Sequence, residues 1–572
     1  MISAAGTLSD AVDVLYSQLA SQPLHPVWIS LVSREAALTR AREIEKHPEL
    51  PLAGKTFAVK DNIDVAGMPT TAGCPAYART PTETATVVRH LERAGALLVG
   101  KTNMDQFATG LVGTRSPYGA CSSVFHDLYI SGGSSSGSAV AVAKQLVDFS
   151  LGTDTAGSGR VPAAFNGLIG LKPTRGLLST AGVVPACRTL DCVSIFARSC
   201  REAHEVWKVA QGFDSADLFS REPDAGVETT AWLNAAFRFG VPPAHQLEFF
   251  GDAAAARLFQ AAVAKLQHIG GEKVEIDFSV FRQAADLLYG GPWVAERLAA
   301  IKDFFHDHAG DMEPTVRTII GGGARYTATD VFEAEYRLRE LRREAELQWS
   351  QMDVLFLPTT GTIYTHDQIA ADPIPLNSNL GYYTNFVNLM DLAAVAAPAG
   401  VRSNGLPFGV SFIGRAFTDE ALLALAHRYI GEASPLLAKP SRCVEIAVVG
   451  AHLSGHPLNR QLMYRGARLQ KACRTSPEYR LYALTGCTPP KPGLIRDEGF
   501  QGPGIELEVW AMPEDEFGSF VSEVSPPLTI GTVVLENGEA VKCFLCETYA
   551  ISSAVEITRF GGWRAYLESS KS

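Results

Sequence analysis

Ser131-Gly-Gly-Ser-Ser-Ser-Gly-Ser138 is followed closely by a second stretch of small residues, Asp154-Thr-Ala-Gly-Ser-Gly-Arg160. The first stretch opens the apolar run 139–146, so its last serines are predicted to cap a helix whose first N–H groups can face an oxyanion. The second stretch follows residues 147–152, which are predicted to form a short buried strand running into a tight turn. Small residues allow the backbone to approach a substrate and to donate hydrogen bonds to developing negative charge. Ser158, at the tip of this turn, is therefore the first candidate nucleophile.

The sequence around these stretches alternates between helical and strand-like patterns. Residues 84–94 have helical periodicity, and residues 96–101 form a continuous apolar run typical of a buried strand. The same alternation returns further along the chain, with a predicted helix at 253–268 and a predicted strand at 353–358. This pattern predicts an α/β fold with helices on both faces of a central sheet.

The composition argues against several functional classes. The 61 acidic residues outnumber the 50 lysines and arginines and give a net charge of -11, so nucleic acid is not expected to be a partner. No apolar segment is long enough to cross a bilayer, and the N-terminus lacks the pattern of a secretory signal. We therefore expect a cytoplasmic protein without a membrane partner.

The ten cysteines suggest neither a disulfide framework nor a metal site. Their scatter along the chain shows no pairing pattern. Only Cys543 and Cys546 have metal-like spacing, and a closed zinc site needs four ligands. Alternation within a strand is the better interpretation of this pair, and no metal is expected.

A serine hydroxyl needs a base to become a good nucleophile, and the sequence points to a lysine. No histidine lies between His126 and His204, so none flanks either serine-rich stretch. A neutral lysine can serve if its pKa falls by roughly three units, about 4 kcal/mol, which burial beside uncharged partners can supply. Lys60, at the end of a predicted strand and next to Asp61, is the candidate. The alternative is a surface lysine, as most lysines are.

Several motifs carry a resemblance to a known family. The stretches 132–137, 154–160 and 167–174, with Val59-Lys60-Asp61 and further matches at 100–105 and 405–410, resemble the amidase-signature family of serine hydrolases. The resemblance covers roughly residues 25–430. It implies the amidase-signature fold, with a mixed central sheet covered by helices on both faces, and a reaction without a metal or organic cofactor.

The resemblance also implies a Ser–Ser–Lys triad. Ser158 would attack an amide carbonyl, and Ser134, preceded by a cis peptide bond, would relay its proton to neutral Lys60. The family's oxyanion hole maps onto the backbone N–H groups of Thr155, Ala156, Gly157 and Ser158. The side chains of Asp154 and Arg160 are expected to hold the loop rather than to take part in the chemistry.

The stretch Leu288-Tyr-Gly-Gly-Pro-Trp-Val-Ala-Glu-Arg297 carries information on the substrate. Its Gly-Gly-Pro sequence predicts a helix beginning at Pro292, with Tyr289 in the preceding loop and Arg297 on the second turn. An arginine beside a tyrosine suits a small carboxylate, through charge-assisted hydrogen bonds. The alternative is an arginine in a surface ion pair.

This stretch is similar to the corresponding part of allophanate hydrolases, a branch of the family in which a tyrosine and an arginine bind the carboxylate of allophanate (urea-1-carboxylate). The branch releases ammonia and leaves N-carboxycarbamate. Residues 448–459 resemble the start of its C-terminal domain, which is related in fold to γ-glutamyl cyclotransferases and is thought to assist decarboxylation, giving ammonia and carbon dioxide. The resemblance makes His452 the acid/base residue of that domain. Alternatively His452 only packs in its loop; His456 is a weaker candidate.

Four parts are therefore expected along the chain. A composition shift at 431–440 marks a boundary, and the Asn537-Gly538 dipeptide predicts a hairpin turn beyond it. At the N-terminus, 8–19 and 29–46 have the pattern of amphipathic helices. The predicted parts are an N-terminal helical arm packing on the amidase domain (1–50), the amidase-signature catalytic domain (51–431), a linker (432–443) and a smaller α+β domain (444–572).

Two other functions stay open at this point. The chain could be a broad-specificity amidase or a glutaminase-type subunit of a tRNA amidotransferase, and its C-terminal domain could be a binding or dimerisation module without chemistry. For allophanate hydrolysis, the expected partners are allophanate itself, a urea carboxylase or another allophanate-producing enzyme, and a second copy of the chain in a homodimer.

Overall fold

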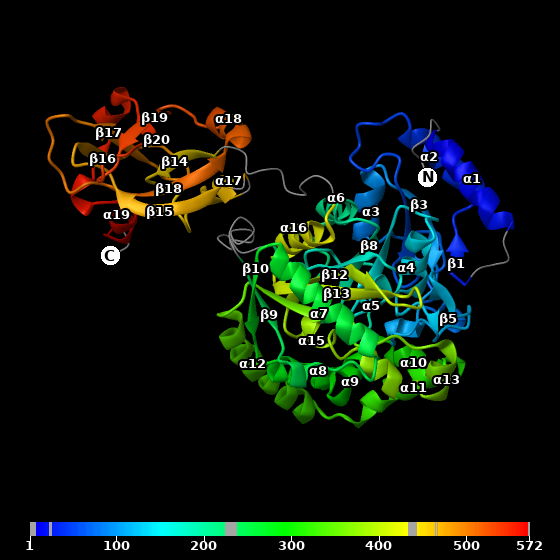
Figure 1. The fold of residues 1–572 in the computed structure, drawn as a ribbon. Helices are drawn as coiled ribbons and strands as arrows, with labels where there is room; N and C mark the ends of the chain where they lie inside the picture. The colour runs from blue at the N-terminus through cyan, green and yellow to red at the C-terminus, as the bar shows by residue number, and fades with distance from the viewer. Residues whose placement is uncertain are drawn as a thin grey trace. The chain divides into compact units, whose positions relative to one another are not determined.

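The computed structural model describes residues 7–21, 26–222, 237–432 and 443–569, apart from 464 and 466. The chain divides into two compact units (Figure 1). Within the described residues, the first unit holds 7–222 and 237–432, and the second holds 443–569. The predicted linker lies outside the described residues except for its ends, 432 and 443.

The first unit is built on one large mixed sheet. β2 is parallel to β3 and β6, and β9 is parallel to β10 and β11, whereas the other pairs are antiparallel. In the described part of the chain, its strands follow in the order β1 (Trp28–Leu31), β3 (Leu97–Thr102), β2 (Thr56–Lys60), β6 (Phe149–Asp154), β8 (Cys192–Ala197), β7 (Ile169–Lys172), β12 (Leu392–Val401), β13 (Pro407–Arg415), β11 (Val354–Pro358), β9 (Phe237–Val241) and β10 (Gly271–Glu275). A small hairpin of β4 (Ser122–Ser123) and β5 (His126–Ile130) lies outside this sheet.

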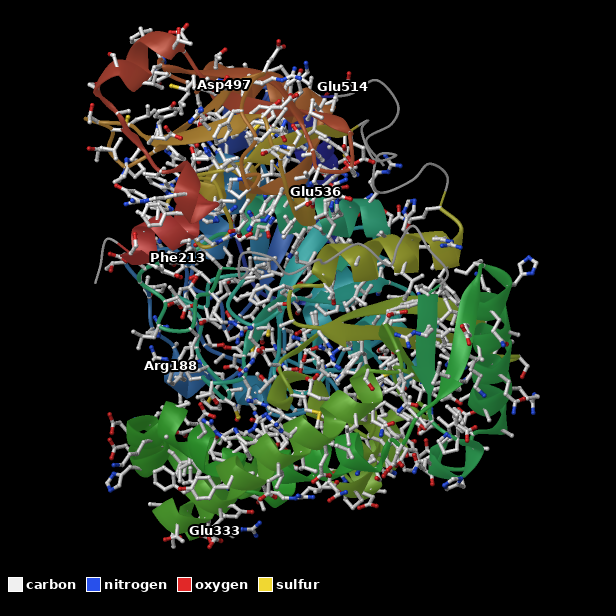
Figure 2. All side chains as sticks on the ribbon, turned by 90° about the vertical axis from the view of Figure 1, so that its left-hand side faces the viewer. Arg188, Phe213, Glu333, Asp497, Glu514 and Glu536 are labelled. Atoms are coloured by element: carbon white, nitrogen blue, oxygen red, sulfur yellow. The ribbon has the colours of Figure 1, made fainter. Side chains whose placement is uncertain are left out.

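Helices pack on both faces of the sheet, which confirms the predicted α/β fold. Along β2, Phe57 and Val59 join a core with α3, α6, α7 and α16, whereas Ala58 joins a core with α1, α2 and α4. The helices of the unit are α1 (Leu8–Ser21), α2 (Arg34–Ile44), α3 (Thr86–Arg93), α4 (Ser136–Ala143), α5 (Val161–Phe165), α6 (Cys200–Ala210), α7 (Ala253–His268), α8 (Ser279–Gly290), α9 (Trp293–Ala300), α10 (Lys302–His308), α11 (Pro314–Gly321), α12 (Ala328–Trp349), α13 (His366–Ala371), α14 (Pro375–Leu380), α15 (Phe386–Leu389) and α16 (Asp419–Ile430). Figure 2 shows the side chains on this framework, including the exposed Glu333 of α12.

The sheet brings the two motif-bearing strands together. β2 and β6 are parallel neighbours, with Val59 opposite Leu151. Their carboxyl ends therefore lie at the same edge of the sheet, so that Lys60 and the turn after Asp154 meet there. α4 begins at Ser136, inside the first serine-rich stretch, and packs against β6.

One prediction for the N-terminal arm is wrong. Residues 29–46 do not form a single helix, because Trp28–Leu31 is the edge strand β1, paired antiparallel with β3. The bulky Trp28 is buried against the rest of the unit, and the backbone of this segment bonds to the free edge of β3 instead of to itself. Helix α2 begins after this strand, at Arg34. Ser33 caps it, because its hydroxyl accepts a hydrogen bond from the N–H of Ala36.

The second unit is a smaller α+β structure with its own core. In the described residues, one sheet has the order β15 (Arg468–Arg474), β18 (Glu506–Pro513), β14 (Cys443–Val448), β20 (Ala540–Cys546) and β19 (Leu528–Val534), and another the order β17 (Pro492–Arg496), β16 (Tyr479–Ala483) and β21 (Val555–Glu556). Its helices are α17 (Asn459–Met463), α18 (Glu514–Ser522) and α19 (Trp563–Ser569). The predicted hairpin joins β19 to β20, and Gly538 has the positive φ of +85° that its turn requires. Cys543 and Cys546 both lie on β20 as unpaired, buried thiols.

None of the described helices is both long enough and apolar enough to span a bilayer.

Candidate active site

Lys60, Ser134 and Ser158 form a continuous hydrogen-bonded chain. Lys60 Nζ donates to Ser134 Oγ at 2.8 Å, and Ser134 Oγ donates to Ser158 Oγ at 2.9 Å. Lys60 and Ser134 are fully buried, and Ser158 is only 2% exposed, so the alternative of a surface lysine is wrong. The Gly133–Ser134 peptide bond is cis. The structure therefore brings together the three side chains that the sequence assigned to a proton relay.

Glycines make this close approach possible. A Cβ on Gly133 would lie 2.1 Å from Asp105 Oδ2, and one on Gly157 would lie 2.4 Å from Thr384 Oγ1. Gly157 also has a φ of +131°, which side-chain-bearing residues rarely adopt. A larger residue at either position would clash with Asp105 or Thr384 and force the backbone next to a relay serine to move.

The surroundings of Lys60 keep much of it uncharged at neutral pH. Burial lowers the pKa of Lys60 to about 7, outweighing the nearby carboxylates of Asp105, Asp191 and Asp154, and the positive charge of Arg297 acts in the same direction as burial. The groups in direct contact with the ammonium are hydroxyls, those of Ser134 and of Thr153, to which Nζ donates at 2.8 Å. A lysine in this state can accept the proton that Ser158 loses.

Asp154 and Arg160 stabilise the turn that carries Ser158. Asp154 accepts hydrogen bonds from the N–H groups of Gly157 at 2.8 Å and Gly159 at 3.0 Å. Arg160 binds the same carboxylate through Nε at 2.9 Å and Nη2 at 3.0 Å. Burial alone would raise the pKa of Asp154, but the paired guanidinium, together with Lys172 and the N–H of Gly159, outweighs it and lowers the pKa. Both side chains thus have contacts that stabilise the loop.

One member of the predicted oxyanion hole needs correction. The N–H of Gly157 is already donated to Asp154, because this buried carboxylate must be satisfied by donors within its own turn. Among the described residues, no acceptor binds the N–H groups of Ala156 and Ser158. The same holds for the N–H of Thr155, directly after β6, so the donors available to an oxyanion are those of Thr155, Ala156 and Ser158.

Asp191 is a buried carboxylate that the sequence motifs do not reveal. It accepts hydrogen bonds from Thr155 Oγ1, from the N–H of Ala186 at 2.8 Å and from the N–H of Cys187 at 3.2 Å. Burial raises the pKa of Asp191 to about 6, against the effect of these donors. The sequence signal is weak, since Asp191 becomes a neighbour of the turn only through the antiparallel pairing of Asp154 with Cys192.

Tyr289 and Arg297 meet, although Tyr289 is not in a loop. It lies in the last turn of α8, because the buried stripe of that helix continues to Leu288 and the helix ends only at Gly290. Arg297, on α9, donates from Nη2 to the Tyr289 hydroxyl at 3.2 Å and from Nη1 to Thr109 Oγ1 at 3.2 Å and the carbonyl of Ala108 at 3.4 Å. Its guanidinium also lies 5.2 Å from the centre of the Tyr289 ring.

The charge of Arg297 has no carboxylate partner in the described part of the chain. The side chain is 2% exposed, its Nε has no hydrogen-bond partner, and the atoms that its other nitrogens contact are neutral oxygens. A surface ion pair, the alternative that the sequence left open, is therefore wrong. Burial opposes ionisation, but Tyr289, Cys187, Asp191 and Glu296 keep the pKa of Arg297 above its usual value. A buried cation without a directly bound anion is costly, so this one is suited to receive an anionic ligand.

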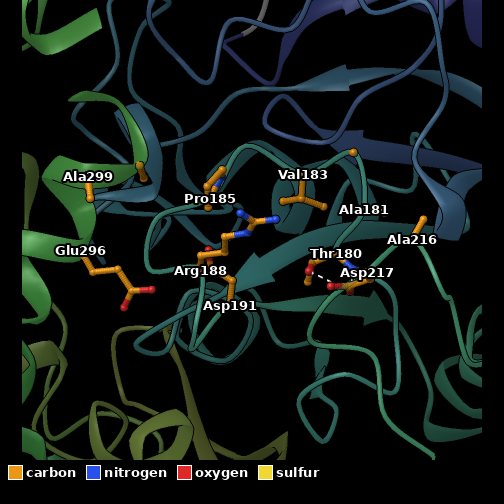
Figure 3. Close-up of a pocket in the computed structure, with 12 residues that line it drawn as sticks. Thr180, Ala181, Val183, Pro185, Arg188, Asp191, Ala216, Asp217, Glu296 and Ala299 are labelled. Carbon is orange, nitrogen blue, oxygen red and sulfur yellow. Dashed lines mark hydrogen bonds between the residues drawn. The ribbon is translucent and has the colours of Figure 1, made fainter. Parts of the chain in front are cut away.

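A pocket of about 670 Å³ opens beside Asp191 (Figure 3). Its wall includes the 180–185 loop, Arg188, and Glu296 and Ala299 of α9. Helix α9 thus contributes Glu296 to the pocket and holds Arg297 buried. Among the described residues, no group of histidine, cysteine and carboxylate side chains is arranged to hold a metal ion.

His452 lies in the second unit, in surroundings of its own. Its Nε2 is 2.8 Å from Gln461 Oε1, and its ring stacks on Phe544 with centroids 4.8 Å apart and meets Phe520 edge-on. Burial lowers the pKa of His452 to about 4, so the imidazole is neutral at neutral pH. The lowered pKa makes this imidazole a weaker proton acceptor than an exposed histidine, and its ring also packs as the alternative interpretation requires. His456 lies in the same loop, half-buried.

Comparisons with known proteins cover both units. A protein-family model for amidases matches residues 16–423, and one for the allophanate hydrolase C-terminal domain matches residues 444–568. Urea amidolyase of Saccharomyces cerevisiae is 44% identical over 98% of this chain and 32% of its own length. The chain thus spans about a third of the length of such curated relatives.

Solved structures and a shorter relative extend the comparison. A selenomethionine-substituted allophanate hydrolase of Kluyveromyces lactis is 43% identical and has a TM-score of 0.73, covering 99% of this chain and 97% of that one. A glutamyl-tRNA(Gln) amidotransferase chain of Exiguobacterium sibiricum is 31% identical but covers 68% of this chain and 86% of its own length.

The relay makes the reactivity of Ser158 depend on pH. Because neutral Lys60 is the proton acceptor and its pKa is about 7, labelling of Ser158 by a fluorophosphonate probe is expected to accelerate as the pH rises from 6 to 8 and then to level off. The rate can be followed by mass spectrometry, with the Ser158→Ala variant as the unlabelled control. A labelling rate that rises only above about pH 9, where an ordinary lysine loses its proton, would contradict the relay.

Proposed function

The chain belongs to the amidase family, and from this premise we propose that it hydrolyses allophanate to ammonia and carbon dioxide. The observation that carries the choice of substrate is the buried guanidinium of Arg297, which makes no direct ion pair with a carboxylate in the described residues. The similarity to allophanate hydrolase of Kluyveromyces lactis over 99% of the chain supports the same choice. Allophanate has an amide for Ser158 and a carboxylate for Arg297 in one small molecule.

The first step is cleavage of the terminal amide. Ser158 Oγ attacks the carbonyl carbon while its proton moves to Ser134, whose own proton moves to Lys60. The tetrahedral oxyanion accepts hydrogen bonds from N–H groups of the turn, for which those of Thr155, Ala156 and Ser158 are available. The relay then returns a proton to the departing nitrogen, and ammonia leaves. Water attacks the acyl-enzyme with the relay again taking the proton, which releases N-carboxycarbamate and restores Ser158.

Arg297 and Tyr289 would bind the carboxylate at the other end of the substrate. The Tyr289 hydroxyl and the guanidinium already contact each other at 3.2 Å, so both can donate to one anion without moving apart. Arg297 is also close enough to lower the pKa of Lys60. Carboxylate binding would neutralise part of this charge and make Lys60 a better proton acceptor.

The second step would take place in the C-terminal unit, whose fold we propose to be related to that of γ-glutamyl cyclotransferases. N-carboxycarbamate, taken as its diacid, breaks down to one ammonia and two carbon dioxide molecules without further water. The nitrogen must gain protons as its bonds to the carboxyl carbons break. His452, neutral at neutral pH, is the proposed acid/base group, and it would first take up a proton from the substrate.

A second candidate function has one observation in its favour. The 31% identity to a chain of a glutamyl-tRNA(Gln) amidotransferase allows the first unit to be a glutaminase-type or broad-specificity amidase, with the C-terminal unit a binding or dimerisation module. That relative covers 68% of the chain, whereas the match to the allophanate hydrolase C-terminal domain accounts for residues 444–568. We therefore propose allophanate as the substrate. In this proposal a urea carboxylase or another allophanate-producing enzyme supplies it, and the chain acts as a homodimer in the cytoplasm.

The proposal is tested by counting products. The purified chain, without partner proteins or tRNA, is expected to release two ammonia molecules per allophanate, measured with an enzyme-coupled ammonia assay beside carbon dioxide evolution. Ser158→Ala should lower the rate by at least about 10³-fold because the nucleophile is lost, while the circular dichroism spectrum is unchanged. If glutamine were hydrolysed and allophanate were not, the tRNA amidotransferase function would replace this one.

Substrate selection is expected to depend on Arg297. Biuret differs from allophanate by carrying a neutral amide in place of the carboxylate. Arg297→Met should lower kcat/KM for allophanate about 10- to 100-fold, the loss of a charge-assisted hydrogen bond, and change kcat/KM for biuret much less. Arg325→Met, which alters an exposed arginine hydrogen-bonded to Tyr326, is the matched control. Equal losses for both substrates would rule out a carboxylate receptor.

The role of His452 can be separated from its packing. His452→Phe keeps an aromatic ring against Phe544 and removes both nitrogens, whereas His452→Ala removes the ring as well. Both variants are expected to release the first ammonia at the normal rate and to release carbon dioxide more slowly. Carbon dioxide release can be measured by stopped-flow absorbance of a pH indicator. Normal carbon dioxide release by the phenylalanine variant would show that the histidine only packs.

A further inference from the structure

Asp191 has three donors and no part in the reaction described above. It is a 7% exposed carboxylate at the end of the segment Cys187–Asp191, directly before β8. Thr155, which donates its hydroxyl to Asp191, is the first residue of the turn that carries Ser158. The carboxylate therefore contacts the nucleophile turn at its first residue, whereas Asp154 binds the N–H groups of Gly157 and Gly159 further along.

The same segment also contacts the helix that carries Arg297. Thr189 donates from its N–H to Glu296 Oε1 at 2.7 Å and from its hydroxyl to Glu296 Oε2 at 2.8 Å. Cys187 Sγ donates to the carbonyl of Trp293 at 3.5 Å. Through these contacts, the segment joins α9 to the turn of Ser158, and Figure 3 shows Asp191 and Glu296 lining one pocket.

Asp191 also contributes to the electrostatics of the relay. Its charge raises the pKa of Lys60 against the effect of burial, as do Asp105 and Asp154, while Arg297 lowers it. The charge of Arg297 on α9 in turn lowers the pKa of Asp191, and Arg188 lines the same pocket. When Lys60 takes the proton of Ser158 through Ser134, a nearby negative charge stabilises the ammonium that forms.

We propose that Asp191 is a positioning residue of this hydrolysis: through Thr155 it holds the nucleophile turn in register with the Arg297 helix, and its charge stabilises protonated Lys60. The inference rests on the proposed function, because it concerns the same relay and the same substrate. It adds a second carboxylate with a role distinct from that of Asp154. Asp154 is paired with Arg160 within its own turn, whereas Asp191 links that turn to a different element.

Two variants separate the two parts of this role. Thr155→Val removes the hydroxyl donated to Asp191 and leaves the carboxylate charge, so kcat for allophanate should fall on the order of 10²-fold with little change in KM, as expected for a misplaced nucleophile. Asp191→Asn removes the charge with little change in shape. Since the charge of Asp191 raises the pKa of Lys60, its loss lowers that pKa, and the rising limb of the kcat–pH profile should move to lower pH.

Asp419→Asn is the matched control. Asp419 is likewise buried and binds the N–H of Thr174 at 2.7 Å and its hydroxyl at 2.6 Å, but it is not among the charges that set the pKa of Lys60. This control should leave the limb in place. The inference is overturned if Asp191→Asn leaves the limb where wild type and the control have it, or if Thr155→Val has wild-type kcat. Should Asp191→Asn fail to fold, the kcat of Thr155→Val decides alone. Wild-type protein that does not hydrolyse allophanate would instead contradict the proposed function.

Discussion

The site depends on keeping the Lys60 amino group out of water. At the carboxyl end of β2 the side chain is fully buried, and its direct contacts are the hydroxyls of Ser134 and Thr153. A charged ammonium is unfavourable in such surroundings, which is why the pKa falls to about 7 and the group can act as a base without a histidine. The parallel pairing of β2 with β6 then places this base within reach of the turn that carries Ser158. The large sheet thus sets both the position and the protonation state of the relay.

Two buried arginines near this base, Arg160 and Arg297, have different partners. Arg160 forms an ion pair with Asp154 that stabilises the turn. Arg297 makes no direct ion pair among the described residues, so its charge is available to a ligand. The difference follows from what each touches. Arg160 makes a bidentate contact with a carboxylate six residues away, while Arg297 touches a tyrosine hydroxyl, a threonine hydroxyl and a carbonyl. Such an arrangement suits a small substrate with one amide and one negative charge.

Much of the site could be predicted from the sequence because its motifs are local. The serine-rich stretches and the strand ending at Lys60 each specify their own backbone, so Ser158, Lys60 and the α/β fold could be predicted from short segments. The role of Ser134 came from the resemblance to the family. The rest depended on long-range pairing. Trp28–Leu31 is a strand only because β3 offers an edge, and Asp191 reaches Thr155 only through the pairing of β6 with β8. The hydrogen bond from the Gly157 N–H to Asp154 likewise could not be predicted, because it depends on the backbone conformation of the closed turn.

The central claim is that Lys60 titrates near neutral pH, so that a large share of it is an uncharged base there, and its titration can be measured directly. In protein labelled with ¹³C at lysine Cε, the Lys60 resonance can be assigned by its loss in a Lys60→Met variant and followed from about pH 5 to 11. The account predicts a midpoint near 7, in line with the burial of this side chain. A midpoint near about 10.4, the value of a solvent-exposed lysine, would contradict it.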